Sequence, residues 1–184
     1  KKEARMKKYR LFILLTVALL VTVFTVNAAS DTASHDVTMN VTEIVLLDLN
    51  DTAAVVLNTT TPTNGGEDPI GSTDSSKLLQ YTSLVPTGQT RSLTVQWGGT
   101  DAAPAGTSLS LEATSVPAGC GTAAPSVTLS SVAQPLITAI GSCATGTGAN
   151  GAQLTFTFSV DTVTSLVVGD NKTVTLTYTL TDAS

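Results

Sequence analysis

Two cysteines are the residues whose type and spacing most clearly predict chemistry in this chain. Cys120 and Cys143 are its only cysteines, and both follow the first 28 residues. An even number of cysteines in a chain that leaves the cytoplasm favours a disulfide over two free thiols. A structural zinc site needs four ligands, which two cysteines and a single histidine do not supply. We predict a Cys120–Cys143 disulfide, worth about 3 kcal/mol in the chain-entropy description.

Oxygen-bearing side chains gather at two other places and are candidates for calcium on ligand type alone. Asp48, Asn50 and Asp51 form the first group, and Asp170 with Asn171 forms the second. Calcium takes carboxylate and carbonyl oxygens. Neither group follows a calcium-loop pattern, and Asp and Asn are also common turn residues. The sequence therefore implies no cofactor, and the first group remains the metal candidate.

Residues for nucleophilic or acid–base catalysis are scarce. His35 is the only histidine, and it lies beside Asp36 in a polar stretch that we expect to be solvated. The chain has no G-x-S-x-G, S-x-x-K or H-E-x-x-H motif. A carboxylate pair could hydrolyse glycosides, but the acidic residues fall mainly in predicted loops. We predict that the protein is not an enzyme, and a secreted hydrolase is the least favoured alternative.

Four asparagines stand in Asn-x-Thr triplets, the acceptor pattern for N-linked glycans. In a threonine-rich chain such triplets arise by chance, and the basic and then apolar start of the chain is similar to a bacterial secretory signal. On the sequence alone, glycosylation is therefore the less favoured interpretation, and it stays open. The triplets are Asn40-Val41-Thr42, Asn50-Asp51-Thr52, Asn58-Thr59-Thr60 and Asn171-Lys172-Thr173.

Residues 1–28 have the three parts of a secretory signal. Basic residues come first, an apolar run covers residues 11–26, and Val26-Asn27-Ala28 suits a signal peptidase. Met6 is the expected start. A membrane anchor is the alternative, although the run is shorter than the roughly 20 residues that a spanning helix needs. The remainder lies outside the cytoplasm in both cases, and only an uncleaved signal would tie it to a membrane.

Charge limits the partners. Residues 1–28 hold six of the nine basic residues and one of the fourteen acidic residues, so three basic and thirteen acidic residues remain, a net charge of −10. Binding nucleic acid needs clustered Lys and Arg, so we exclude it. The remaining cations are Lys77, Arg91 and Lys172.

Alternation of apolar residues with threonine dominates the sequence after residue 36 and predicts strands. In the last run, Val174 to Leu180 alternate with threonines, and we expect the apolar side chains to be buried. We also expect a hairpin of residues 166–168 with this run, and Trp97 in the core. Short strands between turn signals predict an all-β, two-sheet antiparallel, immunoglobulin-like sandwich of about seven to nine strands. The expected organisation is a signal (1–28), a polar leader (29–36) and one domain (37–184).

In organisation the chain resembles fimbrial subunits and related secreted matrix proteins of bacteria. The resemblance rests on the signal, the small Thr-, Ala- and Gly-rich β domain, the cysteine pair, and the first and last apolar runs, 35–49 and 173–182. It implies a structural or adhesive surface protein whose partners are copies of itself or another surface subunit. The assembly strand would add to a neighbour's sheet, and its apolar residues are Val37, Met39, Val41, Ile44 and Leu46.

Two alternatives remain open for this first run and for the function. The run could simply be the first strand of its own sandwich, because consecutive strands usually pair within a domain. The protein could also be a monomeric secreted binding module for a glycan or protein ligand. A filament subunit should form high-mass species, whereas a binding module should stay monomeric.

Overall fold

The computed structural model describes Met6, residues 31–98 and residues 102–182. Apart from Met6, the predicted signal segment lies outside these residues. The chain divides into residues 1–40 and a compact unit formed by residues 41–184. Among the described residues, no helix is both long and apolar enough to cross a membrane.

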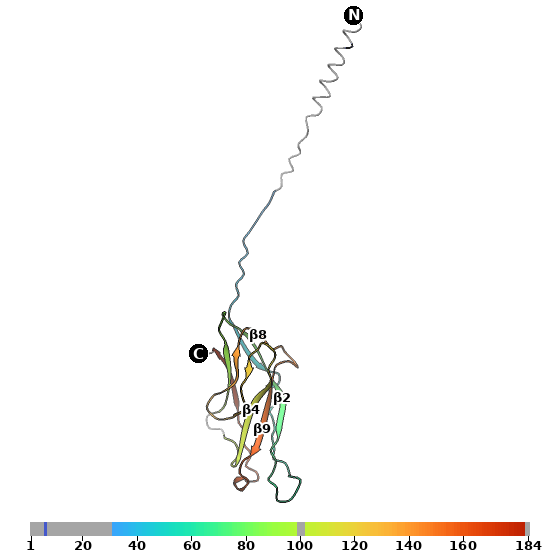
Figure 1. The fold of residues 1–184 in the computed structure, drawn as a ribbon, viewed down its shortest axis with the longest axis vertical. Coiled ribbons are helices and arrows are strands. Elements are labelled where there is room, and N and C mark those ends of the chain that lie inside the picture. The colour runs from blue at the N-terminus through green and yellow to red at the C-terminus, as the bar shows by residue number, and fades with distance from the viewer. Residues whose placement is uncertain (1–5, 7–30, 99–101, 183–184) are drawn as a thin grey trace. The chain divides into compact units, whose positions relative to one another are not determined.

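The compact unit is all-β. Its described residues form ten strands in two antiparallel sheets and one short 3-10 helix, η1 (Val163–Ser165). Figure 1 shows β2, β9 and β4 side by side in the larger sheet. That sheet runs in the order β1 (Ile44–Leu49), β2 (Thr73–Leu84), β9 (Ala152–Val160), β4 (Thr107–Ser115) and β6 (Val127–Thr128), with β8 (Cys143–Ala144) also on β2. The smaller sheet runs β10 (Leu176–Asp182), β3 (Arg91–Trp97), β7 (Gln134–Ile140) and β5 (Thr122–Ala123).

The core lies between the two sheets and consists of the inward rows of the central strands. Alternation decides which side chains enter it, because successive residues of a strand point to opposite faces. Leu79, Leu93 and Leu154 are fully buried, whereas the residues on either side of each are only partly buried. The predictions of an all-β class and of two antiparallel sheets are therefore confirmed. Seven strands have six or more residues, and the other three have only two each.

Three local predictions are wrong. Residues 166–168 form no strand and no hairpin with β10, which pairs instead with β3 from Leu176↔Trp97 to Asp182↔Arg91. Residues 37–41, expected to alternate as part of the first strand, lie outside any strand, and β1 begins only at Ile44. The apolar run of residues 53–57 also predicts a strand, but these residues form none, although Val55 and Leu57 still pack against the core.

Close approach of two segments explains one glycine at the start of the larger sheet. A Cβ at Gly71 would lie 1.8 Å from the Phe158 carbonyl oxygen, so no other residue fits there without a shift of the backbone. Just after it, the Phe158 amide donates to the Ser72 carbonyl at 2.9 Å. Gly71 thus allows the chain to enter β2 against β9.

Candidate functional site

The predicted assembly residues occupy one edge of the larger sheet and the segment that leads into it. Ile44 and Leu46 lie in β1, whose register with β2 runs from Ile44↔Leu84 to Leu49↔Leu79. β1 therefore pairs within its own domain, as the alternative interpretation expected. Val37, Met39 and Val41 are 70%, 86% and 85% exposed. We call residues 37–42 the N-terminal strip.

An ion pair stands immediately before β1. Glu43 accepts a hydrogen bond from the Arg91 guanidinium, which belongs to the first residue of β3 in the other sheet. The Arg91 side chain is only 3% exposed, whereas that of Glu43 is 50% exposed. Moving Glu43 away would leave the buried Arg91 guanidinium without its anion, which costs free energy. The pair therefore favours Glu43 staying at this position. The pair connects the start of β1 to the smaller sheet.

A second ion pair stands two residues after β1. The Asp51 carboxylate accepts a hydrogen bond from Lys77 Nζ at 2.8 Å, and the Lys77 side chain on β2 is only 8% exposed. The hydrogen bond from Lys77 lowers the pKa of Asp51 below its usual value, and one from the Ala53 amide lowers it further. We refer to Glu43–Arg91 and Asp51–Lys77 as the flanking ion pairs.

The flanking ion pairs use two of the three Lys and Arg residues that follow residue 28. The third, Lys172, lies 2.7 Å from Asp170. Each of these cations thus forms an ion pair with a carboxylate, and two of the pairs bracket a single six-residue strand.

The alternation pattern also indicates that Lys77 and Arg91, the cations of the flanking ion pairs, are buried. The sequence-based predictions did not use this indication. Arg91 shares its phase with Leu93 and Val95, and Lys77 shares its phase with Leu79 and Tyr81. Because residues of one phase point to one face of a strand, both cations fall on inward rows. A cation on an inward row needs an anion close by, so each position also predicted a carboxylate partner.

β1 and β10 are both edge strands, and they contact each other where the two sheets meet. Leu47 and Leu49 of β1 are only partly buried, as are Leu176, Tyr178 and Leu180 of β10. The apolar residues of the last run, now in β10, therefore face the core as predicted, but they are only partly buried. The threonines between these residues are exposed, as expected. Incomplete cover leaves apolar surface on this side of the sandwich.

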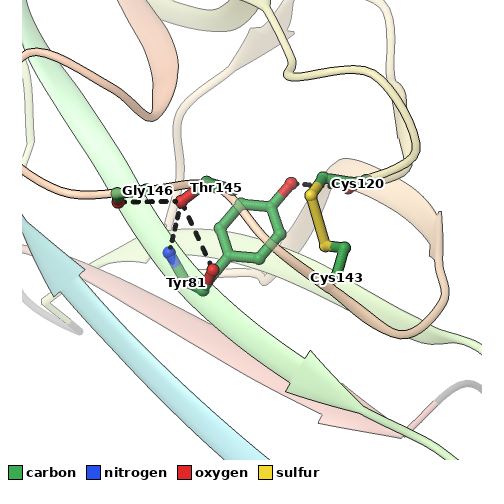
Figure 2. The surroundings of a disulfide bond; sticks show 5 residues. All are labelled: Tyr81, Cys120, Cys143, Thr145 and Gly146. Atoms are coloured by element: carbon green, nitrogen blue, oxygen red, sulfur yellow. Dashed lines mark hydrogen bonds between the residues drawn. A yellow bond between two sulfur atoms is a disulfide. The ribbon is translucent and has the colours of Figure 1, made fainter.

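The disulfide lies in a well-packed part of the core. Cys120 and Cys143 are bonded, with their Cα atoms 5.4 Å apart, which confirms the prediction. Figure 2 shows the Tyr81 ring beside the bond, with its hydroxyl donating to the Cys120 carbonyl at 2.6 Å. The Thr145 hydroxyl accepts from the Tyr81 amide at 2.9 Å. Burial raises the pKa of Tyr81 to about 12, so this phenol stays protonated and keeps donating.

The calcium candidates use their oxygens for contacts within the protein. Asp48 accepts from the Leu49 amide at 2.8 Å, and Asn50 accepts from the Leu78 amide at 2.7 Å. Asp51 is occupied by Lys77, so a cation would have to displace an ammonium group there. Within the described residues, no three His, Cys, Asp or Glu side chains are grouped as a metal site. The calcium assignment stays a prediction without added support.

The residues considered for catalysis are not brought together. His35 is exposed and lies outside every strand. A small open pocket lies beside the N-terminal strip, and its one carboxylate, Glu43, is already paired with Arg91. Trp97 is only partly buried and packs against the core from the end of β3. We therefore take the β1–β10 edge with its flanking ion pairs as the candidate site.

Comparisons with known proteins add no relative to this description. A scan against protein-family models finds no match, and searches of curated proteins and of solved structures find no similar chain.

Proposed function

We propose that this protein is an exported structural or adhesive surface protein that associates with copies of itself by strand addition through the N-terminal strip. The observation that carries the proposal is the exposure of Val37, Met39 and Val41, which alternate with polar residues and belong to neither sheet. An extended segment of this kind can add to an open sheet edge through backbone hydrogen bonds, while its alternate side chains fill apolar pockets.

The composition of the strip supports association between copies. Residues 37–42 carry no charge, in a chain whose part beyond residue 28 has a net charge of −10. Negatively charged copies repel one another at long range. An uncharged apolar segment is therefore the part of the chain best suited to contact another copy.

An acceptor surface of matching character exists on the same chain. β10 pairs with β3 on one side only, and its inward residues Leu176, Tyr178 and Leu180 are partly buried. An edge strand presents unpaired backbone groups to a partner. A strip from a second copy would pair with such groups and cover the half-buried apolar row.

The disulfide supports an extracytoplasmic location, because such bonds persist in oxidising compartments. We place the protein at the cell surface or in the secreted matrix. An immunoglobulin-like arrangement of the two sheets belongs to the same proposal, as it is common among surface proteins.

The test compares self-association of the full chain with that of two strip variants. Met39→Asp places a charge on the apolar row, whereas Thr38→Asp places the same charge on the alternate face. Analytical ultracentrifugation over a wide concentration range should show high-mass species for the parent protein and for Thr38→Asp, and monomer for Met39→Asp. A parent protein that stays monomeric at the highest concentration would contradict the proposal.

A further inference from the structure

The structure separates the asparagines beyond residue 28 by what their side-chain amide nitrogens do. Asn64 Nδ2 donates to Glu67 Oε1 at 2.7 Å, and Asn150 Nδ2 donates to the Thr147 carbonyl at 3.1 Å. Neither of these residues stands in an Asn-x-Ser/Thr triplet. The four that do are all exposed, and within the described residues their Nδ2 atoms make no hydrogen bond: Asn40, Asn50, Asn58 and Asn171.

At Asn50, the hydrogen bond with Leu78 fixes which branch of the side-chain amide is oxygen and which is nitrogen. Its side chain faces the Leu78 amide, which is a donor, so only the carbonyl oxygen Oδ1 can lie there. The nitrogen Nδ2 is left on the other branch of the side chain, and the residue is exposed. The contact with Leu78 thus orients Asn50 with its nitrogen available.

The four triplets also share a relation to the strands in the sequence. Asn40 precedes β1 by four residues, Asn50 follows it directly, and Asn171 precedes β10 by five residues. Asn58 follows along the same connection to β2, where its backbone amide donates to Ser72 Oγ at 2.9 Å. All four asparagines lie outside the strands.

We propose that Asn40, Asn50, Asn58 and Asn171 carry N-linked glycans, which are attached outside the cytoplasm from a lipid-phosphate-linked oligosaccharide. Nδ2 forms a bond to the anomeric carbon of the first sugar, and the bond from that carbon to the phosphate oxygen breaks. The lipid phosphate leaves with the electron pair, and the amide loses one proton. The transfer needs no oxidant or reductant.

This proposal is independent of strand addition, and the two are compatible. In an extended strip, Asn40 lies on the opposite face from Met39 and Val41, because alternate residues point to opposite sides. A glycan on Asn40 would therefore leave the apolar row uncovered. Glycans at the other three sites lie outside the strip altogether.

The experiment is intact-mass spectrometry of the full chain purified from the cells that naturally produce it, alongside single Asn→Gln variants made in the same cells. Each of the four triplet variants should lose the mass of one glycan. Asn64→Gln and Asn150→Gln are the matched controls, since both asparagines are also exposed, and their glycan mass should not change.

A second pair of variants tests whether attachment at Asn58 depends on the acceptor triplet. Thr60→Ser keeps the acceptor triplet of Asn58 and should keep its glycan, whereas Thr60→Ala should lose it. A peptide that contains a triplet asparagine at its unmodified mass overturns the proposal for that site. Glycan mass that survives replacement of all four asparagines indicates attachment to hydroxyl groups and overturns the proposal as a whole.

Discussion

The centre of the sandwich and its β1–β10 edge are built from the same alternating sequence pattern, yet they are held together differently. At the centre, Leu93 and Val95 of β3 are fully buried, and the disulfide closes the core nearby. At the edge, the apolar residues of β10 are only half-buried. There the flanking ion pairs hold β1 to β2 and β3. Position in the sheet thus decides whether a strand is held mainly by apolar burial or also by charge.

The largest expected contrast is between equivalent leucine truncations in the two regions. Leu93→Ala should lower the free energy of unfolding by about 2–5 kcal/mol, because it leaves a cavity in the core. Leu176→Ala should lower it by less, about 1–2 kcal/mol, since a partly exposed side chain loses less apolar burial and leaves no enclosed cavity. Urea unfolding measures both. Equal costs would break the distinction between centre and edge.

Loss of the disulfide should act on the centre. Replacing Cys120 and Cys143 together by alanine should lower the free energy of unfolding by about 3 kcal/mol, because the unfolded chain regains the freedom of the loop. Hydrogen exchange should show faster opening around Tyr81, whose hydroxyl donates to the Cys120 carbonyl. Loss of protection confined to β1 would instead place the disulfide's influence at the edge.

The Glu43–Arg91 pair should matter chiefly to the edge. Glu43→Gln removes a negative charge beside the buried guanidinium and should cost about 1.5–3 kcal/mol, the usual worth of a hydrogen bond to a charged group. Glu112→Gln, on the outward face of β4, is the matched control and should cost little. Thermal unfolding measures the difference. Similar melting temperatures for the two variants would show that this ion pair is not what secures β1.

Acid should weaken the Asp51–Lys77 pair, which follows the end of β1. We expect this to be the smallest of the four predicted effects. The pKa of Asp51 is lowered in the folded state, so its contribution is fully present above the unfolded pKa and is lost as pH falls through the folded pKa. The window therefore lies below about pH 4. Hydrogen bonds from the Ser76 hydroxyl and amide, with a smaller contribution from Lys77, also lower the pKa of Asp74, so both carboxylates titrate there.

The measurement for this acid effect is amide protection of β1 relative to β3, followed from pH 6 to pH 3. Protection of β1 should fall first in the parent protein. Asp51→Asn should show reduced β1 protection at every pH, with a weaker dependence on pH. A parent profile identical to that of Asp51→Asn would contradict a role for this carboxylate.

The alternation of apolar and polar residues was sufficient to predict the core strands and the two antiparallel sheets. In each such strand the apolar side chains all point to one face, and that face must pack in the core. The alternation could not predict the half-burial of Tyr178, since an edge strand and a central strand can carry the same pattern. The disulfide followed from the cysteine count. The identity of the partners of Arg91 and Lys77 required the fold, because Glu43 and Asp51 are distant from them in sequence and are brought close only by β1.

The placement of the cations has a consequence for resistance to proteolysis. Proteases of the trypsin type cut after Lys or Arg and need that side chain, with its flanking backbone, in their own specificity pocket. Beyond residue 28 the chain offers them three such residues, and the side chains of Lys77 and Arg91 are almost fully buried within strands. Cleavage at these two positions requires the sheets to open first, which leaves Lys172 as the one basic residue with a substantially exposed side chain.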